Sequence, residues 1–295
     1  MNKGIKLLVG SLVVASVFIL IQCKKSSVVV VDPLVIKLGT STTLGSYLTD
    51  KDGNTLYFFS NDANGANNCT GGCITAWPIF NVTGLTQAQL GDGLTLSDFT
   101  SITSANGGQL AYKGWPLYYY APGGVREASG QTTGENVGGV WFVAKPDYTI
   151  MIANEQLAGA NGKSYVVSAA NVYTEGTGNT KYFTDQMGRT LYIYALDMAN
   201  TNNYTSTDEV KNAYWPIYET DKAVVPSALD KTLFSRITVF GKKQLTYKGW
   251  PLYYFKSDVD ANGKYRGYNI GVSIGITATS PTKWPILFKD MPAAP

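Results

Sequence analysis

Leu110-Ala-Tyr-Lys-Gly-Trp-Pro-Leu-Tyr-Tyr-Tyr120 is the stretch that decides the organisation of the chain, because it returns almost letter for letter as Leu245-Thr-Tyr-Lys-Gly-Trp-Pro-Leu-Tyr-Tyr-Phe255. The offset between the copies is 135 residues (245 − 110 = 135). Tyr57 and Tyr192, which lie in a second pair of matching stretches, are separated by the same offset. Segments of this length and aromatic content do not match by chance, so the chain contains an internal duplication.

Both halves indicate an all-β fold. Short strand-like runs are separated by turns, and Asp52-Gly53 within Thr49 to Phe59 is a hairpin signal. Sustained 3.6-residue apolar periodicity is missing, so we expect helix of a turn or two at most, for example around Thr86 to Leu90. Each half holds two related strand-turn-strand units, and the four units are compatible with a small propeller or with sandwich-like sheets.

The duplication also sets the expected domain boundaries. We expect a signal peptide over 1–22 and a lipid-anchored tether over 23–34. The first β domain is expected over 35–150 and the second over 181–295. Residues 151–180 between them are expected to form a linker and the strand that leads into the second half.

Composition narrows the class of function. Charged residues make up 15% of the 295, below the roughly 25% of ordinary soluble proteins. The formal charge is +3, and removal of a leader containing Lys3 and Lys6 would leave +1 (3 − 2 = 1). The lack of a basic stripe argues against nucleic acid as a partner.

The chain contains no histidine. This excludes a Ser-His-Asp or Cys-His catalytic unit, a His-ligated haem, and the zinc and copper sites that need imidazole. Catalysis would have to use carboxylates, lysine or tyrosine. The candidate acids Asp92, Asp98, Glu127 and Glu135 fall in turns or loops with no evident pairing, so we expect the protein not to be an enzyme.

The N-terminus carries the marks of a targeting segment. Lys3 and Lys6 precede an apolar run, Leu7 to Ile21, which is shorter than the roughly 20 residues of a spanning helix. The run ends in Leu20-Ile21-Gln22-Cys23, which resembles the lipobox of bacterial lipoproteins, although Gln22 departs from the usual small residue. Cys23 would then carry the lipid, and we expect anchoring in the bacterial cell envelope, at the outer membrane, on its periplasmic or its surface face. A plain signal peptide or an uncleaved anchor remains the alternative.

If Cys23 is lipidated, Cys69 and Cys73 remain as a pair in Cys69-Thr-Gly-Gly-Cys73. A disulfide is the expected state in an oxidising compartment. So small a ring would contribute about 2 kcal/mol. The alternative is a redox-active dithiol, which the spacing and the lack of a nearby cationic residue disfavour.

The order of motifs in each half resembles the bacterial secreted-repeat lipoproteins, a family described by a Tyr-x-(Phe/Trp/Tyr)-x-x-Asp motif. The motif stands at Tyr57 to Asp62, Tyr192 to Asp197 and Tyr253 to Asp258, whereas the fourth copy ends in Gly123. Family members often carry histidine where this chain has Phe142, so any role that rests on that histidine is absent here. The resemblance covers 44–147 well and 181–285 more loosely. It implies an exported, envelope-attached β-rich module and brings no established activity.

The motif residues admit two interpretations. In the first, their aromatic rings pack each strand against the core, and the aspartate starts the next turn. Alternatively, the tyrosines form an exposed platform for a sugar or another flat ligand, in which case Tyr119 and Tyr254 are the outward-facing candidates. The candidate contacts are Tyr57, Phe59, Asp62, Tyr119, Tyr192, Tyr194, Asp197, Tyr253, Tyr254, Phe255 and Asp258.

Asp258-Val-Asp260-Ala-Asn262-Gly263 matches the opening of a calcium-binding loop. The twelfth position is Asn269 instead of the bidentate glutamate, and flanking helices are not predicted. An oxygen-rich turn without metal is the alternative, and otherwise we expect no cofactor.

The sequence therefore favours a non-enzymatic envelope lipoprotein that acts as a binding or interaction module. Its membrane contact would be the N-terminal lipid, and its ligand an envelope protein, a glycan or a small molecule. A second interpretation is an accessory of envelope redox or metal handling that uses Cys69 and Cys73. A hydrolase that works without histidine is the third.

Overall fold

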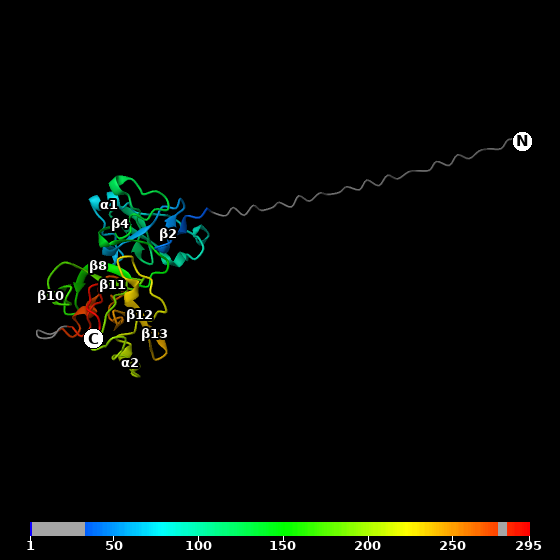
Figure 1. Cartoon of the computed structure of the whole chain (residues 1–295). Coiled ribbons are helices and arrows are strands. Elements are labelled where there is room, and N and C mark those ends of the chain that lie inside the picture. Colours follow the sequence, from blue (N-terminus) through cyan, green and yellow to red (C-terminus); the bar gives the residue numbers. More distant parts are fainter. Residues whose placement is uncertain (2–32, 277–281) are drawn as a thin grey trace. The chain divides into compact units, whose positions relative to one another are not determined.

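The computed structural model describes Met1, residues 33–276 and residues 282–295. Its fold consists mainly of small antiparallel sheets (Figure 1). The expected all-β class is confirmed. The predicted signal peptide, the lipidation site Cys23 and most of the tether lie outside the described residues. Among the residues that are described, none of the helices has the length and apolar character needed to cross a bilayer.

The first half folds as three small sheets, ordered β1-β2, β3-β7 and β4-β5-β6. One α-helix, α1, and several single turns of 3₁₀-helix connect them. The expected turn of helix near Thr86 is confirmed as a 3₁₀ turn over Gln87–Gln89 that begins with a capping box. The elements are β1 (Ile36–Ser41), β2 (Gly45–Asp50), β3 (Tyr57–Phe59), η1 (Ser60–Asp62), α1 (Gly72–Ala76), η2 (Gln87–Gln89), η3 (Leu96–Asp98), β4 (Phe99–Ser104), β5 (Gly107–Tyr112), β6 (Trp115–Pro116), η4 (Pro122–Gly124), η5 (Val137–Gly139) and β7 (Trp141–Val143).

A four-stranded sheet, ordered β10-β9-β8-β11, begins the remainder of the chain, and the sheet β12-β13-β14 follows. The elements are β8 (Met151–Ala158), β9 (Ser164–Val167), β10 (Tyr173–Glu175), β11 (Asn179–Thr184), α2 (Glu209–Asn212), η6 (Lys231–Leu233), β12 (Phe234–Val239), β13 (Lys242–Tyr247), β14 (Trp250–Pro251) and η7 (Ile270–Ser273).

Residues 151–180 depart from the expectation of a linker and a single strand. They form β8, β9, β10 and the start of β11, which is the sheet with the most strands among the described residues. The strand signal of β8 was hidden because Asn154, Glu155 and Gln156 interrupt its apolar residues, so neither alternation nor a continuous apolar run is visible.

The duplication is preserved in the strand register. Phe99 pairs with Tyr112 at one end of the β4–β5 hairpin, and Ser104 pairs with Gly107 at the other. In the β12–β13 hairpin every partner is shifted by 135 residues, so Phe234 pairs with Tyr247 and Val239 with Lys242. The repeated Trp-Pro dipeptide forms a two-residue strand in each half, where proline can stand because it is not required to donate to the ladder.

The two halves share part of their core. One buried cluster combines Phe58, Trp115 and Phe142 of the first half with residues such as Phe183 and Tyr253 of the second. The described residues from 33 onward accordingly group as one compact unit. The domain boundaries expected from the sequence stay a prediction.

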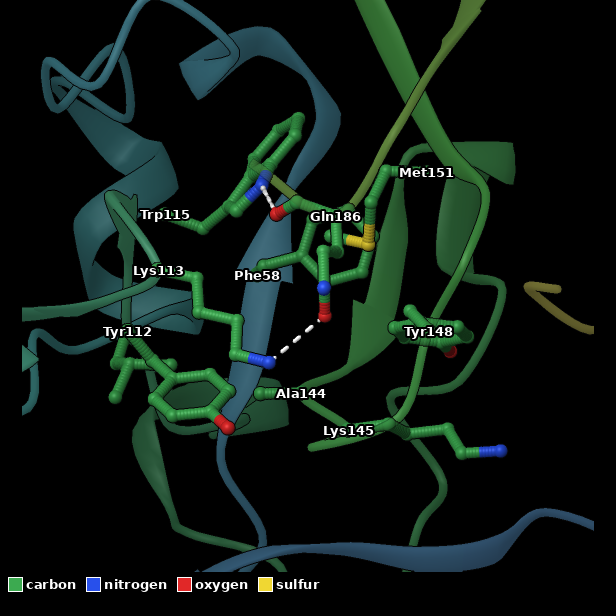
Figure 2. A pocket seen from close by; sticks show the side chains of 10 residues that line it. Phe58, Tyr112, Lys113, Trp115, Ala144, Lys145, Tyr148, Met151 and Gln186 are labelled. Carbon is green, nitrogen blue, oxygen red and sulfur yellow. Dashed lines mark hydrogen bonds between the residues drawn. The ribbon is translucent and has the colours of Figure 1, made fainter. Parts of the chain in front are cut away.

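Polar contacts add to this shared core at Gln186, whose backbone oxygen accepts a hydrogen bond from the Trp115 indole at 3.0 Å (Figure 2). Its side-chain oxygen accepts one from Lys113 Nζ at 2.7 Å. The cavity beside these residues has a volume of about 10 Å³, which is room for about one water molecule. The space between Phe58 and Lys113 is therefore a packing gap and too small for an organic ligand.

Candidate functional site

Each motif aspartate accepts a hydrogen bond from a motif tyrosine of another repeat unit. Tyr118 Oη donates to Asp62 Oδ2 at 2.5 Å, and Tyr253 Oη donates to Asp197 Oδ2 at 2.7 Å, in positions that correspond between the halves. Tyr192 Oη donates to Asp258 Oδ2 at 2.6 Å. The motif therefore joins strand units that are far apart in the sequence, and its recurrence follows from this cross-linking geometry.

Glu127 completes the unit in which the motif has glycine. Its Oε1 accepts a hydrogen bond from Tyr57 Oη at 2.5 Å, which corresponds to the bond from Tyr192 to Asp258 in the second half. From the sequence alone, Glu127 was grouped with the loop acids that have no evident partner, because Glu127 follows Gly123 by four residues and does not fit the motif spacing. Its tyrosine partner lies 70 residues away, so local pattern carried no signal for this role.

The aspartates of these pairs are buried, with 0% exposure for Asp62, 1% for Asp197 and 5% for Asp258. Burial raises the pKa of Asp62 and of Asp258 to about 7 and that of Asp197 to about 6. The tyrosine hydroxyls and backbone N–H groups oppose this rise in pKa, since they stabilise the ionised form. Asn68 N donates to Asp62 Oδ1 at 2.7 Å, and Asn203 N donates to Asp197 Oδ1 at 2.6 Å.

The first half contains a stack of four aromatic rings. Phe59 lies on Trp141 with ring centroids 4.0 Å apart, and Trp141 lies on Trp77 at 3.8 Å. Tyr120 covers the other face of Trp77 at 4.5 Å. The rings come from four separate segments, so the stack fastens those segments through apolar burial and ring contact.

An equivalent stack lies in the second half. Tyr194 contacts Trp284 at 4.7 Å, Trp284 lies on Trp215 at 3.8 Å, and Trp215 lies on Phe255 at 4.3 Å. The correspondence of Trp141 with Trp284 and of Trp77 with Trp215, which the sequence suggested, has this geometric basis. Both tryptophans of the second stack are 4–5% exposed, so their faces are not available to a ligand.

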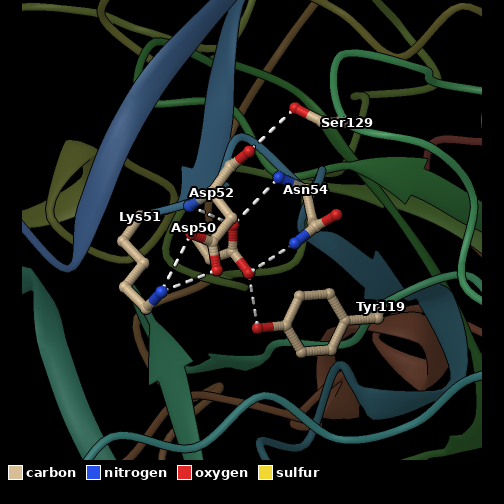
Figure 3. Close-up of polar contacts among 6 residues, drawn as sticks. All are labelled: Asp50, Lys51, Asp52, Asn54, Tyr119 and Ser129. Carbon is tan, nitrogen blue, oxygen red and sulfur yellow. Dashed lines mark hydrogen bonds and ion pairs between the residues drawn. The ribbon is translucent and has the colours of Figure 1, made fainter.

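Tyr119 was expected at the surface, and the structure corrects this expectation, since the side chain is 7% exposed. Its hydroxyl donates to Asp50 Oδ2 at 3.0 Å, and Asn54 Nδ2 donates to the same oxygen at 2.8 Å (Figure 3). The guanidinium of Arg126 covers the ring at 3.7 Å. A Tyr-Tyr-Tyr run does place rings on both strand faces, but β2 and Arg126 cover the face that we expected to be open.

Tyr254 has an equivalent environment and is half-buried. Its hydroxyl donates to Asp185 Oδ2 at 2.9 Å, and Arg189 lies over the ring at 3.9 Å. Burial raises the pKa of Asp185. The motif aromatics thus contribute to the interior more than to a ligand-binding face.

The oxygen-rich turn proposed for calcium does not bring its carboxylates together around one point. Asp258 bonds Tyr192 and also accepts from Gly271 N at 3.0 Å. Asp260 Oδ1 instead accepts from Asn262 N and Lys264 N, both at 2.8 Å, as expected for a hydrogen-bonded turn. Within the described ranges, no group of three or more His, Cys, Asp or Glu side chains could hold a metal ion.

Cys69 and Cys73 form the expected disulfide, with Cα atoms 5.4 Å apart. Cys69 is fully buried beside the aromatic stack of the first half. Its backbone oxygen accepts a hydrogen bond from Asn106 Nδ2 at 3.0 Å. Asn106 stands in the tip of the β4–β5 hairpin, so the disulfide loop and that tip are tied together.

The corresponding place in the second half is an open groove of about 610 Å³. It lies between the loop that carries α2 and the tip of the β12–β13 hairpin. Gly241 occupies the position of Asn106 (106 + 135 = 241), so this tip has no amide with which to reach the loop. The groove is lined by Thr205, Ser206, Thr207, Glu209, Asn212, Ala213, Trp215, Pro216, Ile217, Glu219, Val239, Phe240 and Lys242.

Sequence reasoning missed this groove. A signal was present, since aligning the halves places Phe240 opposite Ala105 and Gly241 opposite Asn106 within otherwise matching hairpins. The exposure of Phe240 is 66%, higher than the 51% of Tyr214, the other aromatic residue among the exposed large hydrophobic residues of the described chain. The groove and Phe240 are therefore the candidate functional site, while the motif residues form the scaffold.

The fold and the paired networks define a duplicated all-β repeat protein. Three segments of the chain, 40–81, 100–145 and 237–271, match a family model described as a secreted repeat of unknown function. The chain thus contains the secreted repeat that its motifs suggested. No curated protein and no solved structure matches the chain significantly.

Proposed function

We propose that the protein is a non-enzymatic binding module of the bacterial cell envelope, attached to the outer membrane through lipid on Cys23. The match to a secreted repeat supports export, and the lipobox-like Leu20-Ile21-Gln22-Cys23 supports the lipid anchor. The groove beside Phe240 is the proposed ligand-binding site.

The observation that carries this proposal is the difference between two equivalent places in one chain. The first half ties its hairpin tip to the Cys69 carbonyl, whereas the second leaves about 610 Å³ open at that place. This volume lies within the roughly 300–1,000 Å³ typical of ligand pockets. Duplicated scaffolds can therefore divide their roles, with the first half contributing to the shared core and the second presenting a binding surface.

A redox or metal role for Cys69 and Cys73 is less well supported. The Cys69 side chain is buried, and its carbonyl is fixed by Asn106. Reactive cysteines lie in electropositive and partly exposed surroundings, so this environment favours a structural disulfide.

Fluorine NMR of the full chain labelled with 5-fluorotryptophan tests the proposed site. Trp215 lines the groove, and Trp77 occupies the matching position of the first half. Titration with chitotetraose, a basic decapeptide and a short-chain phospholipid should give one probe that shifts the Trp215 resonance saturably and leaves Trp77 in place. Resonances are assigned with Trp→Phe variants. If all three probes leave Trp215 unshifted, or shift both tryptophans equally, the groove is not the binding site.

The anchor needs a separate experiment. Cells that express the wild-type chain should incorporate labelled palmitate into it and retain it in the membrane fraction. The Cys23→Ala variant should lose both properties. Palmitate incorporation that persists in Cys23→Ala would disprove the anchor.

A further inference from the structure

We infer that the groove of the second half binds a carbohydrate chain, with a sugar ring packed on the exposed face of Phe240. The inference rests on the proposed function and names the chemistry of its ligand. It is carried by the backbone at the hairpin tip and by the residues that line the groove.

Phe240 occupies a position that folding alone does not favour. The two-residue tip of the β12–β13 hairpin has φ of 46° at Phe240 and 81° at Gly241. Left-handed backbone of this kind suits glycine or asparagine and is costly for a bulky residue. In the first half, the residues with left-handed φ do not include Ala105, the counterpart of Phe240.

Burial of the Phe240 ring offsets little of this backbone cost, since 66% of the residue is exposed. Residues held on strained backbone cluster at functional sites, and a ligand in the groove would give the Phe240 ring the contact that the fold does not. Phe240 lines the groove together with Val239 and Ile217, so the lining includes three apolar side chains.

Polar groups line the same groove. Thr205 and Thr207 bring hydroxyls, and Glu209 and Glu219 bring carboxylates. Lys242 Nζ lies 3.5 Å from a carboxylate oxygen of Glu219, and the side chains of this pair are 63% and 53% exposed. The groove therefore offers hydrogen-bond donors and acceptors beside an aromatic face.

This combination matches a sugar, which has an apolar C–H face and a rim of hydroxyl groups. An acyl chain would desolvate the two glutamates without giving them hydrogen-bond partners, which is unfavourable. An anionic ligand would meet two glutamates and one lysine, a net charge of −1 (1 − 2 = −1). An uncharged oligosaccharide satisfies the hydroxyls and carboxylates and also covers Phe240.

The test uses chitotetraose, cellotetraose and maltotetraose with the full chain. At least one should bind saturably in calorimetry and shift the fluorotryptophan signal of Trp215. Phe240→Asn should weaken that binding by about tenfold or more, because loss of a stacked ring costs on the order of one power of ten in Kd. The same variant should melt at a higher temperature than the wild type, because asparagine tolerates left-handed backbone.

Two further variants complete the design. Glu219→Gln should weaken binding, because the amide is a poorer acceptor for sugar hydroxyls than the carboxylate. Val210→Ala is the matched control, since Val210 is 74% exposed on the same loop and does not line the groove. Its affinity for the oligosaccharide should equal that of the wild type.

The possible failures are distinct. If the basic decapeptide or the phospholipid shifts Trp215 and the three oligosaccharides do not, the carbohydrate inference is wrong and the binding groove stands. Oligosaccharide binding that Phe240→Asn leaves unchanged also refutes the inference. If none of the probes shifts Trp215, both the inference and the proposed function are rejected.

Discussion

The two halves of the chain contain the same buried contacts and differ at one surface. Tyr118 with Asp62 and Tyr253 with Asp197 are the same contact built twice. Gln109 and Gln244 repeat a second contact, since each side chain donates at 2.9 Å to a backbone oxygen in its own half. Buried contacts tolerate little change, because each depends on several partners at once.

The two halves differ in the surface loops, which are outside these buried contacts. After the motif aspartate, the first half has the disulfide loop and Asn106 holds the hairpin tip against it. The matching loop of the second half has no disulfide and contains α2, where Asp208 accepts from Lys211 N at 3.0 Å and Lys211 Nζ donates to Tyr204 O at 2.6 Å. Both loops are stabilised, but the second is stabilised without covering the groove. The two halves therefore differ in whether the loop and the hairpin tip are tied together.

The largest expected effect concerns the two aromatic stacks. Trp141→Ala and Trp284→Ala should each destabilise the protein by about 3–5 kcal/mol, because each removes a buried ring from a four-ring stack. Chemical denaturation of the two variants measures the free energy of unfolding. Similar losses would support equal structural roles for the halves. A loss below about 1 kcal/mol in either variant would contradict the equivalence of the stacks.

The buried aspartates each give stability a pH dependence on the order of 3–4 kcal/mol, because one unit of pKa difference corresponds to about 1.4 kcal/mol. Their pKa values of about 6–7 in the folded chain lie above the value of about 4 expected when unfolded. The folded state therefore binds protons more tightly. The stability that this contributes is complete below about pH 4 and is lost as the pH rises through 6 and 7.

Melting curves from pH 4 to pH 8 test this linkage. Asp62→Asn and Asp197→Asn should each flatten the decline, because asparagine keeps an acceptor oxygen and cannot ionise. The effect of Asp62→Asn should extend to higher pH, since the pKa of Asp62 is about 7 and that of Asp197 about 6. A wild-type melting temperature that does not fall between pH 5 and pH 8 would show that these carboxyls are not proton-linked to folding.

The smallest expected effect is that of removing the Cys69–Cys73 disulfide, which distinguishes the first half. The double variant Cys69→Ser, Cys73→Ser should lose about 2 kcal/mol, because the disulfide closes a short ring and restricts the unfolded chain little. Chemical denaturation of the variant and of the reduced wild type should agree. Binding of oligosaccharide at the Phe240 groove should be unchanged. A variant that loses this binding would show that the halves do not act independently.

The sequence alone was sufficient for much of the scaffold. The 135-residue offset predicted equivalent hairpins, and the strand registers match it residue for residue. The Cys69–Cys73 disulfide could be predicted because two glycines between the cysteines allow a tight return of the chain. These features are local or repeated, so spacing and turn chemistry encode them directly.

Contacts between residues far apart in the sequence were harder to predict from the sequence. Glu127 replaces the missing motif aspartate only because the fold brings it to Tyr57, and Tyr119 is buried only because β2 and Arg126 cover it. The strand β8 was missed because its central polar residues conceal the pattern.

The repeated Tyr-Lys-Gly-Trp-Pro-Leu-Tyr stretch, the duplication and the all-β class were thus determined by the sequence itself, because strand pattern and turn residues act over a few positions. The tertiary structure decided which rings stack, which acids meet tyrosines, and which hairpin tip stays open. Packing makes those choices among many chemically similar partners. A difference as small as Asn106 against Gly241 acquires meaning only when the surface opposite it is known.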